Sequence, residues 1–227
     1  MITMPFKSTL KSALRSTASS LSLRRFSKQY RDDERGIAAI EFAIIAPVMI
    51  GMYFGLAEVA HAISVDRRIS HATNVAGDLA THQPQLTLAT VEEVLSAALR
   101  VMDIPDVDQV SMDIESFILP AAGQPPESQG RIRLNIANAN FPSFAAASLD
   151  TNLLNENSGV VVTRVKYNYT PLEFRFIDTT VTLQETFLLK PRRSDSVQIQ
   201  NGPGSLVDCS ATDFSNVTCS ITASAAP

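Results

Sequence analysis

A single carboxylate, Glu41, lies near the start of a long apolar segment, residues 37–57, whose other ionisable side chain is Tyr53. An acid inside a bilayer costs about 2.5–3.5 kcal/mol on insertion scales, so Glu41 needs a partner or a solvated position. If the chain is cut after Gly36, Ile37 carries the new terminal ammonium. Glu41 is then the fifth residue of the mature chain.

An ammonium and a carboxylate at this offset can pair between neighbouring helices that pack with a stagger of one turn. Each charge then lowers the cost of placing the other in lipid. The alternative is an uncleaved signal anchor whose Glu41 lies at headgroup depth. The sequence therefore predicts Gly36 and Ile37 as a processing site and Glu41 as an intramembrane pairing group.

The same segment carries a row of small or ring-closed residues at a spacing of four. In lipid, such rows let helix backbones approach closely, as in a GxxxG pair. Pro47 removes one helix hydrogen bond and predicts a kink. Glycine and proline are also frequent in membrane helices that pack on nothing. The predicted helix-packing row consists of Ala39, Ala43, Pro47, Gly51 and Gly55.

Residues 37–57 would span about 32 Å as a helix, against about 30 Å for a bilayer core. No small-residue cleavage site follows them, so we expect a retained anchor. Residues 1–36 hold eight Lys/Arg and three Asp/Glu, whereas the rest of the chain holds 11 and 20. The positive-inside rule then puts the basic N-terminus in the cytoplasm and the acidic body outside. The acidic body argues against nucleic-acid binding.

The leader, residues 1–36, is rich in Ser, Thr, Lys and Arg and is predicted to be mostly disordered. A cationic surface helix and a mitochondrial presequence are the alternatives. After the apolar segment the helical pattern continues to residue 82, where Gln83-Pro84 ends it. A second helix is predicted from a capping box at Thr90 and ends at Ile104-Pro105.

Beyond residue 105 the apolar period shifts towards two, which is typical of strands. The expected fold class is α+β, with a helix on an antiparallel sheet hung from a long N-terminal helix. Either Val161, Thr163, Val165, Tyr167 and Tyr169 or the residues of opposite parity would face the core. The predicted strands are residues 110–119, 131–136, 159–169 and 174–189, and residues 194–227 are predicted to be loop.

Two cysteines, Cys209 and Cys219, lie close together in the C-terminal segment. They predict a disulfide if the domain is exported, and two free thiols otherwise. The histidines, His61, His71 and His82, suit no usual metal motif, and no metal or cofactor is expected. Glu58 and His61 are one turn apart, and solvated interfacial side chains are favoured over a proton relay. No catalytic motif occurs, so we expect no enzymatic activity.

Gly36-Ile-Ala-Ala-Ile-Glu-Phe-Ala-Ile-Ile-Ala-Pro47 resembles the opening motif of the TadE/TadG-like family of tight-adherence (Flp) pilus assembly systems. The segment is also similar to type IV pilins and pseudopilins, whose basic leaders end in Gly and precede a helix with Glu at its fifth position. The leader departs from that pattern in its length and in Asp32, Asp33 and Glu34. The chain length resembles TadE-type minor pseudopilins.

The resemblance implies a bacterial inner-membrane protein that a prepilin peptidase processes, with pilus-assembly subunits and pilin-like helices as partners. The alternative function is a signal-anchored periplasmic binding or enzymatic domain whose helix is only a tether. The expected organisation is a basic cytoplasmic leader, a transmembrane helix with its extension, a periplasmic α+β domain and a C-terminal segment. Their boundaries are 1–36, 37–82, 83–193 and 194–227.

Overall fold

The computed structural model describes residues 36–121, 124–135, 141–149, 155–171, 180–200 and 202–222. The chain divides into two compact units, Met1–Phe54 and Gly55–Pro227. The prediction for the leader lies outside the described residues except for Gly36, as do parts of the predicted strands 131–136 and 174–189.

The helix α2 (Ile37–Thr81) begins in the first unit and ends in the second. It runs unbroken through Pro47 and stops just before Gln83-Pro84, so the predicted long helix is confirmed. Within the second unit α2 buries one face, at spacings of three and four residues that bring side chains onto one side of a helix. The main members of this face are Glu58, Val65, Ile69, Ala72, Thr73, Ala76, Gly77, Ala80 and Thr81.

The second helix, α3 (Leu88–Met102), begins earlier than the capping box at Thr90 predicted. Thr87 is the N-cap, and its hydroxyl oxygen accepts the Thr90 N–H at 3.4 Å. Thr87 can cap because Leu86 already lies in the short strand β1 (Gln85–Leu86), so the helix starts directly after that strand. At the other end Asp103 takes a left-handed conformation and its N–H bonds the Leu99 carbonyl.

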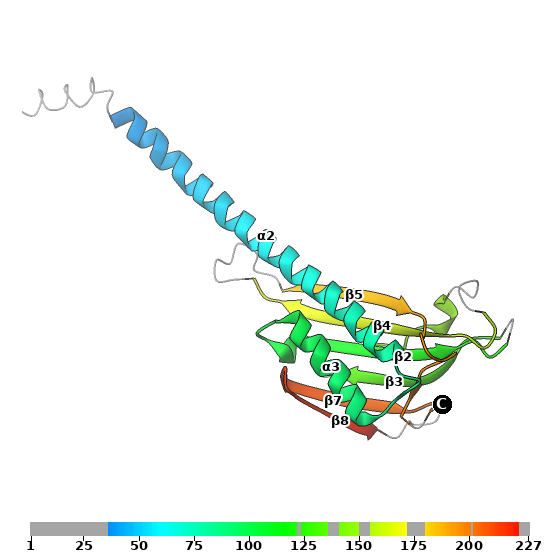
Figure 1. The fold of residues 1–227 in the computed structure, drawn as a ribbon. Helices are drawn as coiled ribbons and strands as arrows, with labels where there is room; N and C mark the ends of the chain where they lie inside the picture. The colour runs from blue at the N-terminus through cyan, green and yellow to red at the C-terminus, as the bar shows by residue number, and fades with distance from the viewer. Residues whose placement is uncertain are drawn as a thin grey trace, which may run out of the picture. The chain divides into compact units, whose positions relative to one another are not determined.

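A six-stranded sheet forms the body of the second unit in the order β5-β4-β2-β3-β7-β8 (Figure 1). Its strands pair antiparallel except for β3 with β7, which are parallel because the chain returns from β5 and β6 to the far side of β3. The strand bounds are β2 (Val110–Ile118), β3 (Glu127–Leu134), β4 (Gly159–Tyr169), β5 (Val181–Leu189), β7 (Leu206–Asp213) and β8 (Asn216–Thr222). A separate parallel pair joins β1 to β6 (Gln198–Ile199). The α+β class is therefore confirmed, with one parallel pair in the large sheet.

The prediction of a loop over residues 194–227 is wrong for most of its described part. Strands β7 and β8 form a hairpin at one edge of the sheet, and β6 pairs with β1. The hairpin alternates, because Val207, Cys209 and Ala211 face the core while Asp208 and Ser210 lie on the other side. The core-facing residues here are small and the others are polar, so the alternation is not apparent from the positions of bulky apolar residues.

Both faces of strand β4 are buried, so the two sets of alternate residues that were predicted as alternatives both face apolar surroundings. Val161, Val165, Tyr167 and Tyr169 join the main core beneath α2 and α3. On the opposite face, Val160 and Val162 form a second cluster with Phe117, Leu119 and Leu149. Residues 141–149, which include the turn η3 (Ala146–Ser148), supply part of that second cover.

A buried ion network holds this cover on the sheet. Asp113 is fully buried, and its carboxylate accepts hydrogen bonds from Arg131 Nε at 2.5 Å and Arg164 Nε at 3.0 Å. Arg131 Nη2 donates to the Phe141 carbonyl at 2.9 Å, and Arg164 Nη2 donates to the Pro142 carbonyl at 2.8 Å. The two guanidinium groups therefore neutralise Asp113 and bind the backbone of the covering segment at once.

Glu115 lies beside this network and is also buried. Its Oε2 accepts the Phe144 N–H at 3.1 Å and its Oε1 accepts the Ser128 hydroxyl at 3.4 Å. Burial raises the pKa of Glu115, against the opposing effects of the Phe144 N–H and the Arg131 charge. Folding therefore disfavours the ionised form of this carboxyl.

Gly77 lets α2 approach the sheet closely. A Cβ at this position would lie 2.5 Å from Leu189 Cδ1 and 2.9 Å from Thr163 Oγ1. Thr163 is fully buried on a central strand and has little room to move. We expect Gly77→Ala to lower the free energy of unfolding by about 1–3 kcal/mol, the usual effect of overpacking. Denaturant unfolding of the full chain in detergent measures it.

Gly55→Ala is the matched control, because a Cβ there meets no described atom within 4 Å. That variant should unfold like the wild type. Equal stability of the two alanine variants would contradict the close approach at Gly77.

Glu115→Gln should make stability less dependent on pH. Below the ordinary pKa of 4.5 the carboxyl is neutral in both folded and unfolded states. As pH rises from there through the raised folded pKa, the wild type loses stability because ionisation favours the unfolded chain. The variant does not titrate, so its stability relative to wild type should increase over that interval. Urea unfolding across the acid range measures this difference.

Asp113→Asn serves as the contrasting variant, since it leaves the guanidinium groups of Arg131 and Arg164 buried beside a neutral amide. A loss of about 3–5 kcal/mol is expected, as for other broken buried ion pairs. If Glu115→Gln ran parallel to the wild type at every pH, the account of Glu115 would be wrong.

Candidate functional site

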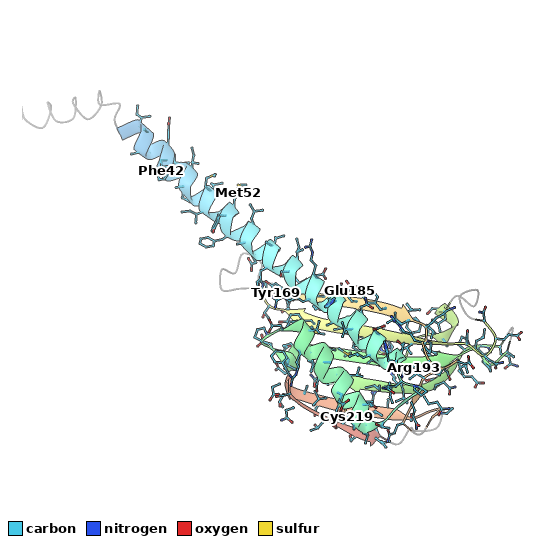
Figure 2. The ribbon with its side chains drawn as sticks, in the orientation of Figure 1. Phe42, Met52, Tyr169, Glu185, Arg193 and Cys219 are labelled. Atoms are coloured by element: carbon cyan, nitrogen blue, oxygen red, sulfur yellow. A yellow bond between two sulfur atoms is a disulfide. The ribbon has the colours of Figure 1, made fainter. Side chains whose placement is uncertain are left out.

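Most apolar side chains in the first 20 residues of α2 are exposed. Ile40, Phe42 and Met52 are 62%, 71% and 60% exposed (Phe42 and Met52 are labelled in Figure 2). This helix is the one in the described part of the chain that is long and apolar enough to cross a membrane. A contiguous apolar surface of this size is unsuited to water and suited to lipid or to other helices. The segment is consistent with a single-pass membrane anchor.

The predicted processing and pairing residues lie together at the start of this segment. Gly36 directly precedes the first residue of α2, Ile37, and Glu41 follows one turn later. All three are exposed, and no described group pairs with the Glu41 carboxylate. Within the described residues the Glu41 carboxylate is therefore left without a charge partner.

The predicted packing row is also unoccupied by described residues. Ala39, Ala43 and Pro47 are exposed, and a Cβ added at Gly51 or Gly55 would meet no described heavy atom within 4 Å. A row at a spacing of four inclines by about 26° to the helix axis, so a second helix packed along it would cross at an angle. No described residue would stand in the way of such a helix.

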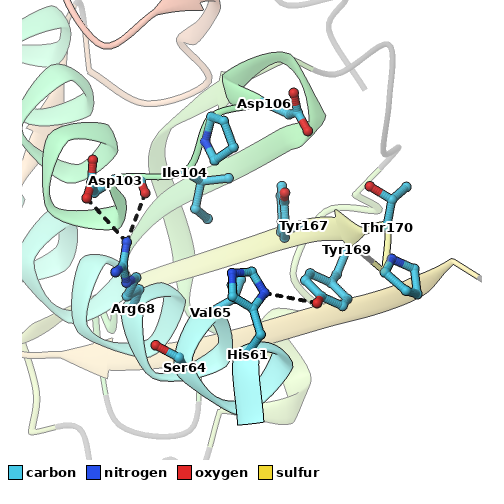
Figure 3. Close-up of a pocket in the computed structure, with 12 residues that line it drawn as sticks. His61, Ser64, Val65, Arg68, Asp103, Ile104, Asp106, Tyr167, Tyr169 and Thr170 are labelled. Atoms are coloured by element: carbon cyan, nitrogen blue, oxygen red, sulfur yellow. Dashed lines mark hydrogen bonds and ion pairs between the residues drawn. The ribbon is translucent and has the colours of Figure 1, made fainter. Parts of the chain in front are cut away.

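A cavity of about 580 Å³ opens in the second unit between α2, the segment after α3, and the end of β4. His61 Nδ1 lies 3.0 Å from the Tyr169 hydroxyl, and the two rings are 5.8 Å apart (Figure 3). Tyr167 also lines the cavity; it is 5% exposed, and its hydroxyl has no hydrogen-bond partner among the described residues. Burial and the charge of Asp106 raise the pKa of Tyr167. Sequence reasoning identified the strand but not this cavity, because its walls come from three separate segments, near residues 61–68, 103–106 and 167–171.

Arg68 closes one side of the cavity. Its Nη1 donates to the carbonyl and to a carboxylate oxygen of Asp103, at 3.0 Å and 3.3 Å (Figure 3). Asp103 is the C-cap of α3, where a cation is favourable for the helix dipole. Both side chains are exposed, at 47% and 78%, so the pair adds little to stability.

Glu58 is buried, which corrects the expectation of a solvated side chain. It is 5% exposed, and neither carboxylate oxygen has a hydrogen-bond partner among the described residues. It is buried because it shares the face of α2 that carries Val65 and Ile69. Burial raises the pKa of Tyr169, and the negative charge of Glu58 raises it further.

The predicted disulfide is confirmed between Cys209 in β7 and Cys219 in β8, which lie directly opposite each other. The Cys219 N–H donates to Glu92 Oε1 at 3.0 Å, so the hairpin is also bound to α3. His61, His71 and His82 are not brought together. Among the described residues no group of three or more His, Cys, Asp or Glu side chains could hold a metal ion.

Residues 36–78 match the family model of TadE-like proteins. The match confirms the resemblance to the TadE/TadG-like family and supports a role related to tight-adherence pili in general. It covers the exposed part of α2 and most of the face that α2 buries. No curated protein and no solved structure matches the chain significantly.

Glu58→Gln should lower the pKa of Tyr169 while leaving it above the ordinary value of 10.0, since burial remains after the charge is gone. The tyrosinate absorbance of the full chain, titrated against pH, measures the change. Subtracting a spectrum of the same protein with Tyr169→Phe isolates this residue. An unchanged Tyr169 pKa in this variant would show that the charge of Glu58 has no effect on the phenol.

Proposed function

We propose, from the TadE-like match at residues 36–78, that this chain is a pseudopilin-like assembly subunit of a bacterial tight-adherence pilus system. The observation that carries the proposal is the exposed half of α2, which has an apolar surface, one carboxylate and a row of small residues that no described residue covers. Such a surface acts by packing against other helices in a membrane. The role is structural, and its partners are pilin-like helices and other assembly subunits.

In the proposed mechanism, a prepilin peptidase cuts between Gly36 and Ile37. The new ammonium and Glu41 are four residues apart, which is about 6 Å along a helix and close to one turn. A neighbouring pilin-like helix shifted by one turn therefore presents a charge of opposite sign to each group. In lipid this pairing is strong, because the alternative is an isolated charge at low dielectric.

The folded domain is proposed to lie in the periplasm, with the N-terminus in the cytoplasm and α2 in the inner membrane. The Cys209–Cys219 bond supports this orientation, because such bonds persist in oxidising compartments and are rare in the cytosol. The charge asymmetry between residues 1–36 and the body supports the same orientation.

Glu41→Ala should leave processing intact but impair pilus assembly, since cleavage depends on the peptidase and assembly on the charge pair. N-terminal sequencing should find Ile37 in both proteins, and pilus shedding measures assembly. Glu93→Gln is the control, an exposed acid on α3 whose change should leave assembly normal.

A double-mutant cycle tests the pairing itself. Gly36→Leu, intended to block cleavage, removes the free ammonium. If that ammonium and Glu41 are partners, the defect of Glu41→Ala should vanish in the uncleaved background. Additive defects would argue against the pair, and a mature chain that does not begin at Ile37 would remove the processing step.

Exchange of residues 37–57 for an unrelated membrane anchor separates this proposal from a tethered binding domain, whose candidate site is the cavity beside His61. Loss of assembly is expected here. Retained function would favour the tethered domain.

A further inference from the structure

The cavity beside His61 and Tyr169 is held close to the membrane surface by the chain itself. His61 follows Ala57, the last residue of the apolar segment, by four residues. Four residues span at most about 14 Å when fully extended and about 6 Å as a helix. The headgroup layer of a bilayer is about 5–8 Å deep on each side. Whenever the apolar segment spans a bilayer, the mouth of the cavity is therefore within reach of lipid headgroups.

The cavity presents groups of both charges. On one side Arg68 uses Nη1 for Asp103 and keeps its remaining N–H groups free of described partners. Beside it, His61 uses Nδ1 for Tyr169, which leaves Nε2 for a ligand. These donors suit a phosphate, for which a guanidinium is the preferred side chain.

On the other side Asp106 supplies a carboxylate. It precedes the turn η2 (Val107–Gln109) but makes no side-chain capping bond there. Its charge raises the pKa of Tyr167, which places the carboxylate within electrostatic reach of that hydroxyl. Asp106 is thus available to an ammonium group in the same cavity.

Tyr167 adds a hydroxyl to the wall of the cavity (Figure 3). The residue as a whole is 5% exposed, and its hydroxyl oxygen, which no described residue bonds, is open to the cavity. Such a hydroxyl bonds water or a ligand, as donor and as acceptor. A ligand with both donor and acceptor atoms can therefore replace the water here.

We propose that this cavity binds the headgroup of a zwitterionic phospholipid with a primary amine, a phosphoethanolamine lipid. The phosphate lies against Arg68 and His61, and the ammonium lies against Asp106, with the Tyr167 hydroxyl between them. Phosphatidylglycerol lacks the ammonium, and phosphatidylcholine lacks its N–H donors, so both bind less well. A volume of about 580 Å³ accommodates a headgroup and part of its glycerol. The proposal needs α2 in a membrane but is independent of any role in pilus assembly.

Native mass spectrometry of the full chain in detergent micelles tests this, with phosphatidylethanolamine, phosphatidylglycerol and phosphatidylcholine added in turn. The wild type should retain one phosphatidylethanolamine with a preference of about tenfold over the other two lipids. Asp106→Asn should lose the preference while still binding phospholipid. Arg68→Gln should weaken retention of all three lipids.

Glu93→Gln is the matched control, because this exposed carboxylate on α3 does not line the cavity. Tyr167→Phe should weaken phosphatidylethanolamine retention in a chain whose circular dichroism and thermal unfolding match the wild type. The proposal is overturned if the wild type shows no preference among the lipids. It is equally overturned if Asp106→Asn and Glu93→Gln behave alike.

A soluble competitor identifies the source of the headgroup. Glycerophosphoethanolamine should displace the lipid only weakly, because it lacks the acyl chains that hold the headgroup at the membrane. Displacement at concentrations equal to those of the lipid would mean that the site takes free phosphoamines, and the lipid assignment would fall. None of these measurements depends on pilus assembly, so this proposal and the proposed function can fail separately.

Discussion

The folded unit depends on the close packing of one face of α2 against the sheet. That face is built largely of small residues, and at Gly77 even a methyl group would collide with Thr163 and Leu189. Close approach to the sheet at Gly77 fixes the position of the preceding helical turns of α2, which carry His61 and Arg68. It is this packing that brings His61 beside Tyr169 and Arg68 beside Asp103, so the cavity is a product of it. The second helix, α3, then completes the same core.

Three carboxylates in apolar surroundings differ in how their charge is compensated. Asp113 is neutralised within the chain by Arg131 and Arg164. Its burial is tolerated only while both guanidinium groups are present, because removing one partner leaves a buried charge unpaired. Glu58 is buried without a hydrogen-bond partner among the described residues, and its charge is felt at Tyr169. Glu41 is exposed on a surface suited to lipid, where no described group can compensate it. The described residues therefore compensate the charge of Asp113 but not that of Glu41.

The long helix, the strands β2 and β4 and the disulfide were predictable, because each depends on a local pattern, whereas β3 begins four residues before its predicted start. Residues 159–169 are β-branched and aromatic along their whole length, and β4 has those bounds. The edge hairpin was missed because Cys209, Ala211 and Val217 are small and alternate with Ser and Thr, which resembles a loop. The cavity was missed for a different reason. Its walls come from residues near 61, 105 and 169, and only the tertiary fold joins them.

The apolar residues at the two ends of α2 have different surroundings. From Val65 onwards its apolar residues are buried by the sheet and by α3, and a change there acts on folding. From Ile37 to Tyr53 most apolar residues are exposed, and a Cβ added at Gly51 would meet no described atom within 4 Å. Substitutions of these exposed residues should leave the folded unit intact, because among the described residues none of them belongs to its core. A loss of assembly with an unchanged folded unit would then reflect contacts made by the exposed surface, which is how an assembly subunit is expected to behave.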